Sequence, residues 1–335
     1  MTEKLARKKT SDLKRILPGI AISLVALILV FTIVDFQDVV FALSQAEYKY
    51  LLIGIPVYLL GYVFRALGWG VLLNNEVDFK NVFLTMQAGY LLNNVLPFRL
   101  GELGRAFILG RKNLGFWRVF STIIIERAFD MILAAGLLLG TIPFALRSDQ
   151  SRDVAYLVAG IVLIGLGCLH LLARYQNWAI NLYEKFSSKW QFVSRFGIER
   201  LQGFFQGLSV LTDFLKFFRV LVWMILSWSA AILYQYVVLL AFVPKAQVLW
   251  AAFGLATVSL GVALPSSPSY IGIIEAAWVG SLALFEVPYA SALAYALTVH
   301  LLHILISLVF GTYALSREGE SFGQIYKELR QRKKK

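Results

Sequence analysis

Long apolar stretches, separated by short charged segments, dominate this chain of 335 residues. A helix needs about 20 apolar residues to cross the hydrocarbon core of a bilayer. Stretches of this kind lie at about 16–34, 51–73, 121–145, 155–173, 221–243 and 291–315. Two further apolar regions, 82–117 and 249–284, are interrupted by Pro, Gly and Asn. The pattern predicts an all-α, polytopic membrane bundle over 16–315, with about six full spans and two broken regions.

The overall composition agrees with an integral membrane protein. Hydrophobic residues make up 59% of the chain, charged residues make up only 16%, and the mean hydropathy is +0.69. These values are too apolar for an ordinary soluble protein of this length. The apolar run after the basic segment 1–15 lacks a small-residue cleavage site, so we expect it to be retained as the first span. The single cysteine, Cys168, excludes an internal disulfide and a cysteine-based metal site.

Basic residues are concentrated in three segments that flank the apolar stretches. Six Lys and Arg lie in 1–15, seven lie in the connection 174–219 and seven lie in the tail 316–335. Because Lys and Arg accumulate in cytoplasmic loops, we expect both termini and the connection to face the cytoplasm from the cell (inner) membrane. The broken regions are then either two opposed re-entrant loops or two pairs of short spans. An inverted repeat favours the re-entrant loops.

The connection 174–219 has a helical pattern of its own. Apolar residues recur at steps of three and four from Ile198 to Leu215, with polar residues on the other faces. This spacing predicts an amphipathic helix, which either lies in the headgroup layer or braces two spans. The net charge of +12 follows from the basic loops and requires no nucleic-acid partner.

The two broken regions share a sequence arrangement. In 96–102 and in 264–275, Leu-Pro is followed within a few residues by Gly and Glu. Broken apolar segments at corresponding places in two halves indicate a transporter's binding site. Non-helical backbone is tolerated at membrane depth only where protein or water covers its polar groups. The sequence therefore predicts a polar cavity inside the bundle at these breaks.

Charged residues beside the first break are candidates for phosphate binding. Arg99, Glu102 and Arg105 are three residues apart, so they share one helix face. Guanidinium groups bind phosphate through paired, planar hydrogen bonds. We expect the two arginines to hold a lipid phosphate, while the glutamate orders one of them or contacts a cationic headgroup. A solvated cytoplasmic face is the alternative.

Other ionisable residues lie inside the predicted spans, where a charge is usually internal and paired. The segment 126–130 carries Glu126, Arg127 and Asp130, which form either a structural ion pair near the interface or a charged wall of the cavity. Arg65 lies midway along its span and needs a carboxylate partner, for which Glu126, Asp130 and Glu275 are the candidates.

Glu275 and two histidines are the remaining candidates. Glu275 lies just after the second break, where it either complements a helix dipole or takes part in substrate or proton coupling. His300 and His303, three apart in the last span, are either a proton relay or hydrogen-bonded packing residues.

These motifs together resemble a known family. The pattern Asn-x-x-x-Pro-x-Arg-x-Gly-Glu-x-x-Arg runs from Asn93 to Arg105, Glu-Arg-x-x-Asp follows at 126–130, and Leu-Pro with Gly-x-x-Glu ends at Glu275. Over about 20–315, the chain resembles the lysylphosphatidylglycerol synthetase transmembrane-region family, flippase-like proteins related to the membrane half of the bacterial multiple peptide resistance factor. The family's third motif is usually richer in glycine, and Ser269 and Tyr270 stand where glycine is expected.

The resemblance implies translocation of a membrane lipid, typically an aminoacylated phosphatidylglycerol. Related modules also occur beside glycolipid and polyprenyl-lipid pathways, so another anionic or glycosylated lipid fits equally. In full-length resistance factors a soluble transferase domain follows the membrane part. Since this chain ends at Lys335 without room for one, the resemblance does not imply synthesis here.

We therefore expect a lipid translocator that is not an enzyme and uses no metal or other cofactor, since no His/Cys cluster, nucleotide-binding glycine loop or nucleophile elbow occurs. Membrane phospholipids are its expected partners; a homo-oligomer and a separate lipid-synthesising enzyme are further ones. A membrane-embedded lipid-modifying transferase and a non-transporting scaffold are the alternatives. The candidate substrate-binding residues are Asn93, Asn94, Pro97, Arg99, Glu102, Arg105, Glu126, Arg127, Asp130, Pro265, Gly272 and Glu275.

Overall fold

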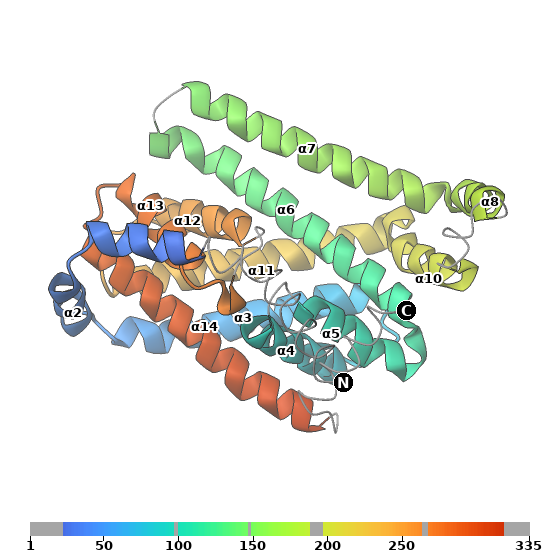
Figure 1. Cartoon of the computed structure of the whole chain (residues 1–335), viewed down its shortest axis with the longest axis horizontal. Coiled ribbons are helices and arrows are strands. Elements are labelled where there is room, and N and C mark those ends of the chain that lie inside the picture. The colour runs from blue at the N-terminus through green and yellow to red at the C-terminus, as the bar shows by residue number, and fades with distance from the viewer. Residues whose placement is uncertain (1–22, 97–99, 147–148, 188–196, 263–266, 318–335) are drawn as a thin grey trace, which may run out of the picture.

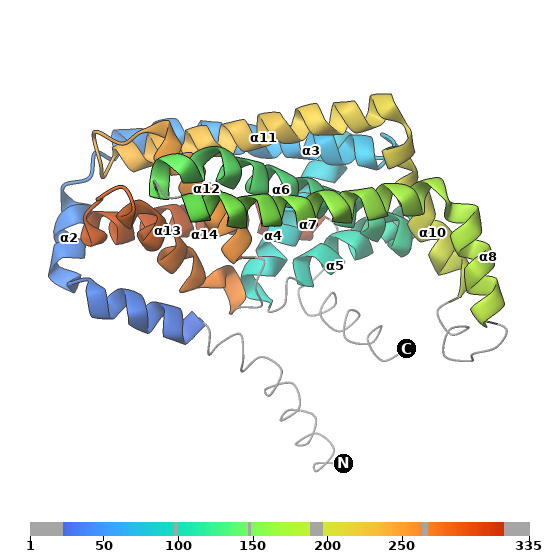
Figure 2. The same ribbon diagram turned by 90° about the horizontal axis from the view of Figure 1, so that it is seen from above.

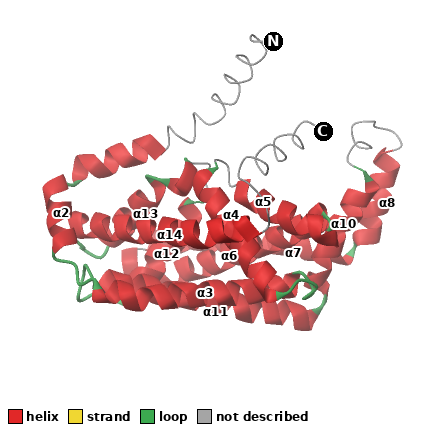
Figure 3. Cartoon of the chain, turned by 90° about the horizontal axis from the view of Figure 1, so that it is seen from below, coloured by secondary structure: helices red, strands yellow, loops and turns green. Residues whose placement is uncertain are grey.

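The computed structural model describes residues 23–96, 100–146, 149–187, 197–262 and 267–317. Helices make up almost all of these residues, and no strand occurs among them (Figure 3). The prediction of an all-α fold is therefore confirmed.

The helices follow one another with short connections (Figure 1). A helix over Ser23–Ile33 leads into α2 (Phe36–Ser44), and the two are bent by 81°. Next come α3 (Lys49–Leu72), α4 (Phe79–Val95), α5 (Leu100–Leu109), the π-helical turn η1 (Gly110–Leu114), α6 (Phe116–Leu146), α7 (Asp149–Arg174) and α8 (Gln176–Ser187). The chain continues with α10 (Ile198–Leu208), the 3₁₀ turn η2 (Ser209–Thr212), α11 (Phe214–Leu240), α12 (Val248–Gly261), the 3₁₀ turn η3 (Pro268–Tyr270), α13 (Ile273–Ala283) and α14 (Tyr289–Arg317).

Four of the described helices are long and apolar enough to cross a membrane. They are α3, α6, α11 and α14, and the bent pair at the N-terminal side would make a fifth span. Four predicted spans therefore fall on α3, α6, α11 and α14, and every predicted end lies within seven residues of the end of the helix. The predicted span at 155–173 falls in α7, whose apolar part is Leu163–Arg174, and the one at 16–34 begins outside the described residues. The full span count stays a prediction.

Helices α3 and α11 run side by side along one edge of the molecule (Figure 2). Small residues allow this close approach: a Cβ on Gly54 would lie 2.9 Å from Val238 Cγ2. The Ser227 hydroxyl of α11 donates a hydrogen bond of 3.1 Å to the backbone oxygen of Gly61 on α3. In membranes, where helices cannot gain from excluding water between them, small residues and such hydrogen bonds favour association.

Each broken region forms a pair of packed short helices, α4 with α5 and α12 with α13. A Cβ on Gly101 of α5 would lie 1.9 Å from the backbone oxygen of Gly89 on α4, and one on Gly254 of α12 would lie 2.0 Å from the Trp278 ring on α13. All four helices are shorter than the about 20 residues of a full span. These lengths favour the re-entrant topology, which stays a prediction.

The predicted amphipathic helix in the connection is shorter than its pattern indicates. Helix α10 ends at Leu208, η2 follows, and Asp213 then begins α11 by accepting hydrogen bonds from the backbone nitrogens of Leu215 and Lys216. The apolar face of α10 packs against α6, where Gly207 fits over Ser121. This contact agrees with a helix that braces α6.

Candidate functional site

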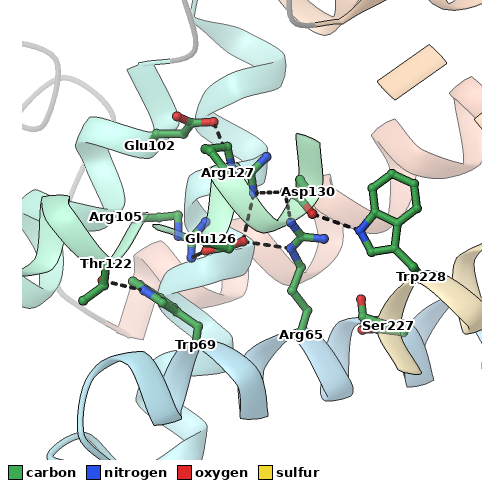
Figure 4. Close-up of polar contacts among 11 residues, drawn as sticks. Arg65, Trp69, Glu102, Arg105, Thr122, Glu126, Arg127, Asp130, Ser227 and Trp228 are labelled. Atoms are coloured by element: carbon green, nitrogen blue, oxygen red, sulfur yellow. Dashed lines mark hydrogen bonds and ion pairs between the residues drawn. The ribbon is translucent and has the colours of Figure 1, made fainter. Parts of the chain in front are cut away.

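Six charged side chains of the described residues form one ion-pair network where α3, α5 and α6 meet (Figure 4). They are Arg65 from α3, Glu102 and Arg105 from α5, and Glu126, Arg127 and Asp130 from α6. Arg65 lies seven residues before the end of α3, or about 10 Å along the helix, and Glu126 lies about 15 Å from the start of α6. The network is therefore set well inside two helices that can span a membrane.

Glu126 is the centre of the network. Its carboxylate is buried, with only 1% of the side chain exposed, and three arginines surround it. Arg65 Nε lies 2.8 Å from Oε1, Arg127 Nη2 lies 2.8 Å from Oε1, and Arg105 Nη2 lies 2.5 Å from Oε2. The carboxylate thus holds together three separate helices.

Asp130 lies one helical turn further along the same face of α6. Its Oδ2 pairs with Arg65 and lies 3.1 Å from Arg127 Nη2. Its other oxygen, Oδ1, accepts a hydrogen bond of 3.0 Å from Trp228 Nε1 of α11. The spacing of four residues brings both carboxylates of α6 to Arg65.

Arg105 is enclosed by the protein, with 1% of its surface exposed. Its guanidinium carbon lies 3.9 Å from the centre of the Trp69 ring, and Trp69 Nε1 donates a hydrogen bond of 3.0 Å to Thr122 Oγ1. A Cβ on Gly89 would lie 2.4 Å from Arg105 Cγ, so this glycine makes room for the arginine stem. Stacking on an indole ring favours a desolvated arginine.

Among the described residues the network contains three arginines and three carboxylates, whose formal charges balance. A buried charge is strongly unfavourable unless it is paired and hydrogen-bonded, and this balance is what allows the group to persist inside the bundle. The arginines therefore do not form an open cationic patch. An anion that binds to the paired guanidinium nitrogens has to replace a carboxylate.

One side of the network is more accessible than the rest. The Arg127 side chain is 32% exposed and that of Glu102 is 21% exposed, and Arg127 Nε lies 3.7 Å from Glu102 Oε1. Within the described residues, Arg105 Nε and Arg127 Nε have no hydrogen-bond acceptor. Arg105 Nε is enclosed, whereas Arg127 Nε lies next to the weak, partly exposed ion pair with Glu102. That second donor suits a ligand with several acceptor oxygens.

A second polar group lies at the second break. Glu275 and His300 are both buried, and Glu275 Oε1 lies 2.5 Å from His300 Nδ1. Glu275 Oε2 accepts a hydrogen bond of 2.7 Å from the backbone nitrogen of Gly272 at the start of α13. His300 Nε2 lies 2.8 Å from the backbone oxygen of Ser269 in η3. Glu275 therefore pairs with the histidine of α14, and Arg65 takes its two other predicted partners.

The two breaks touch each other. Ser269 Oγ donates a hydrogen bond of 2.9 Å to the backbone oxygen of Asn94, near the end of α4. Asn94 Nδ2 donates to Ser307 Oγ of α14 at 2.5 Å, and Asn93 Oδ1 accepts from the backbone nitrogen of Gly101 at 2.8 Å. Both asparagines thus satisfy polar groups near the breaks, as the interrupted backbone requires.

The predicted site residues fall into three sets. The charged network contains Glu102, Arg105, Glu126, Arg127 and Asp130, and the junction of the breaks contains Asn93, Asn94, Gly272 and Glu275. Pro97, Arg99 and Pro265 lie outside the described residues, so the phosphate role of Arg99 stays a prediction.

Sequence reasoning missed the aromatic residues that position the charges. Trp69 lies four residues after Arg65 on the same face of α3, so its proximity to the network could have been anticipated. Trp228 contacts Asp130 from a helix about 100 residues away, and no spacing rule links the two.

The two residues that stand in place of glycine adopt a backbone conformation that suits glycine. Ser269 has φ 57° and Tyr270 has φ 60°, and both values lie in the left-handed region. This region is unfavourable for residues with a Cβ by roughly 1–2 kcal/mol each. The break therefore keeps a backbone shape typical of a glycine-rich motif, although its sequence differs.

Comparisons with known proteins identify the family. A model described as the lysylphosphatidylglycerol synthase TM region matches residues 16–311. The chain belongs to this family. A relative, the UPF0104 membrane protein MJ1078 of Methanocaldococcus jannaschii, is 26% identical over 224 residues, which cover 66% of this chain and 91% of that protein. No solved structure gives a significant match.

A second relative is the glycosyltransferase AglD of Haloferax volcanii, 25% identical over 338 residues. The match covers 88% of this chain but only 53% of that protein. The resemblance stated from the motifs is thus confirmed. This member of the lysylphosphatidylglycerol synthase TM-region family is a multi-pass membrane protein with a lipid-related function.

The expectation that this protein is not an enzyme is contradicted by these comparisons. The family is described by the name of a synthase, and one relative is named as a glycosyltransferase, so the chain belongs to an enzyme-related family. Sequence reasoning failed here because it looked for catalytic motifs within this chain. The absence of known catalytic motifs therefore does not exclude an enzyme-related family.

Proposed function

We propose that this protein binds the phosphate-bearing headgroup of a membrane lipid at the Arg65–Arg105–Arg127 network and carries that lipid between leaflets. The observation that supports this most is that three arginines surround the buried carboxylate of Glu126, well inside a helix that can span a bilayer. Intramembrane charges of this kind are usually functional.

Binding would proceed by exchange of ion-pair partners. A lipid phosphate offers several acceptor oxygens and would replace the loosely held Glu102 beside Arg127, where the network is most exposed. Glu102 or Asp130, once released, could then contact a cationic headgroup such as an aminoacyl group. The contact between the two breaks would form the barrier on the path between leaflets.

Leaflet exchange in proteoliposomes tests this proposal. Fluorescent phosphatidylglycerol, lysyl-phosphatidylglycerol and a neutral lipid would be compared for wild type, Arg127→Ala and Arg118→Ala. Arg118 is a matched control, because it lies on the same helix α6 but pairs with Glu76 at the surface. We expect the loss of a charge-assisted contact, about 1.5–3 kcal/mol, to slow exchange of the anionic lipids about 10- to 100-fold in Arg127→Ala only.

Two outcomes would contradict translocation. Exchange no faster than in protein-free liposomes, from protein shown to be folded, would exclude transport of these lipids. Equal exchange by Arg127→Ala and wild type would show that the network does not hold the headgroup.

A second candidate function is to hold a lipid acceptor for a transferase reaction. The relative named as a glycosyltransferase supports it, since this chain matches about half of that protein. This function predicts that the lipid binds without exchanging leaflets, and that native membranes containing the protein form a lipid species that Arg127→Ala membranes lack. Mass spectrometry of lipid extracts would detect that species.

A further inference from the structure

Both ring nitrogens of His300 face oxygen atoms inside the protein. Nε2 lies 2.8 Å from the backbone oxygen of Ser269, and Nδ1 lies 2.5 Å from Glu275 Oε1. His300 is 6% exposed and Glu275 is 3% exposed, so water does not take the place of either partner. The contacts are short enough to be hydrogen bonds.

This geometry fixes the number of protons on the pair. A backbone carbonyl oxygen can only accept, so Nε2 of His300 must carry a hydrogen. The contact between Nδ1 and Oε1 also needs a hydrogen, which belongs either to the imidazolium or to a neutral carboxylic acid. Both forms hold the same two protons. Removal of one proton would leave a carboxylate facing the lone pair of Nδ1.

Within the part of the chain that the structure describes, no other charged group contacts Glu275 or His300. Along α14 the nearest ionisable residue is His303, whose ring centre lies 6.0 Å from that of Tyr58 on α3. Helix α4 carries Tyr90 and, at its far end, Lys80, and α2 carries Asp38. Helix α11 carries Tyr234 and Tyr236 and, in its first two turns, Lys216 and Arg219. Helix α14 itself carries Tyr289, Tyr295, Tyr313 and Arg317. Tyr270 belongs to η3, while α12, α13 and the helix over Ser23–Ile33 carry no other ionisable side chain than Glu275.

The pair also holds the second break in place. His300 of α14 contacts the backbone oxygen of Ser269, and Glu275 of α13 accepts a hydrogen bond from the backbone nitrogen of Gly272. The segment between Ser269 and Gly272 is therefore held at both of its ends. Ser269 in turn donates to Asn94 at the end of α4. Because Ser269 has a left-handed φ of 57°, this conformation depends on the contacts that surround it.

We propose that Glu275 and His300 form a proton-binding site that locks the two breaks together, and that loss of its proton releases Ser269 and opens the junction. Protonation would hold the closed arrangement, and a rise in pH would favour the open one. This inference does not depend on the proposed lipid transport, because it concerns the closed junction itself.

Exposure of a buried residue beside the break tests the proposal. Ile273, at the start of α13, is 7% exposed and takes no part in the hydrogen bonds of the junction. In a Cys168→Ser background, the rate at which a maleimide alkylates Ile273→Cys would be followed from mildly acidic to alkaline pH. Above the titration point of the pair, opening is expected to raise this rate by up to about tenfold per pH unit.

Glu275→Gln is the matched control. A glutamine amide can donate to His300 Nδ1 while its oxygen accepts from Gly272, so it imitates the proton-bound carboxyl at every pH. Dividing the alkylation rate of the protein that keeps Glu275 by the rate of the Glu275→Gln variant removes the pH dependence of the thiol itself. We expect this ratio to rise with pH. A ratio that is independent of pH would overturn the proposal.

A second measurement is made on the wild-type protein, and a variant serves only to assign the signal. The chain contains three histidines, so nitrogen NMR of histidine-labelled wild-type protein in nanodiscs gives few signals, and His300→Asn identifies that of His300. The proposal requires a hydrogen on Nε2 and a hydrogen shared at Nδ1 in the closed state. A His300 without a hydrogen on Nε2 would contradict it.

Discussion

Glu126 is the residue on which the stability of the charged network depends most. Its buried carboxylate faces Arg65, Arg105 and Arg127, and Asp130 and Glu102 neutralise the remaining charge. Removing one partner of a buried ion pair leaves an uncompensated charge, which costs about 3–5 kcal/mol. The network is therefore a source of specificity and also a point of vulnerability.

We predict that Glu126→Ala lowers the free energy of unfolding by about 3–5 kcal/mol, because three guanidinium groups then lose their shared acceptor. Denaturant unfolding of the purified protein in detergent would measure the change. Glu126→Gln should be as destabilising or nearly so, since it keeps the shape of the side chain but not its charge.

Glu76→Ala is the control for this prediction. Glu76 pairs with Arg118 at the surface, where its side chain is 47% exposed, so its loss should change stability by no more than about 1 kcal/mol. The hydrogen bond from Arg118 holds the pKa of the Glu76 carboxyl below its usual value. The small contribution of this pair is therefore present at neutral pH and is lost as the pH falls through that lowered pKa. Equal losses in both variants would contradict the special role of Glu126.

Ser269 gives a second prediction at the residue scale. Its φ of 57° disfavours any side chain, while its hydroxyl donates to Asn94. Ser269→Gly loses a hydrogen bond worth about 1 kcal/mol but relieves backbone strain of similar size. Ser269→Ala loses the bond and keeps the strain. We therefore expect alanine to be less stable than glycine here, the reverse of the usual helix order. Thermal unfolding of both variants would measure this order of stability. A Ser269→Ala protein at least as stable as the Ser269→Gly protein would contradict the strained geometry.

At the residue scale, the sequence predicted the contacts that local spacing along one helix determines. The Glu126–Asp130 spacing indicates a shared face, and the need of Arg65 for a carboxylate follows from its place in an apolar span. The choice of partner did not follow: Glu275 was as good a candidate for Arg65 until the fold brought it to His300. Such pairings depend on which helices pack together, and periodicity carries no information about that.

At the scale of elements, the close packing of α5 against α4 depends on glycine. Gly101 of α5 lies against the backbone of Gly89 on α4, and the same contact places Arg105 across Gly89. Backbone atoms on both sides leave no flexible side chain that could move aside. The position of Arg105 over Trp69 is thus a consequence of how two short helices approach each other.

We predict that Gly101→Ala destabilises the protein by about 1–3 kcal/mol, because its Cβ would lie 1.9 Å from the backbone oxygen of Gly89 and would force α5 away. Gly136→Ala on α6 is the matched control, since a Cβ there meets nothing within 4 Å. Its stability should stay within about 1 kcal/mol of wild type. Thermal unfolding of both variants measures the difference, and a Gly101→Ala protein as stable as the control would contradict the close packing.

Elements were predictable where apolar length alone decides them. Helices α3, α6, α11 and α14 coincide with predicted spans, whereas the amphipathic pattern from Ile198 to Leu215 suggested one helix where α10, η2 and the start of α11 occur. The three- and four-residue spacing of apolar residues continues through η2, so it did not show where α10 ends. The cap at Asp213, which begins α11, was not recognised as a start signal.

At the scale of the whole molecule, the charged network and the junction of the two breaks are linked through α4. Its Gly89 borders Arg105 of the charged network, and Asn94, five residues later, binds Ser269 at the second break. A movement of α4 would therefore be felt at both sites. The correspondence of two Leu-Pro breaks was visible in the sequence, but their mutual contact follows from the fold of the two halves against each other.

We predict that an anionic phospholipid opens the junction of the breaks by acting on the charged network. Addition of phosphatidylglycerol to nanodiscs should raise the alkylation rate of Ile273→Cys, because a phosphate that displaces Glu102 would shift α5 and the α4 packed against it. Arg127→Ala should abolish this response to lipid but keep the response to pH, which belongs to Glu275 and His300. If Arg127→Ala still responds to the lipid, the network does not sense the headgroup. If Arg127→Ala loses the response to pH as well, the charged network and the junction behave as one cooperative unit. The pH response would then not belong to Glu275 and His300 alone.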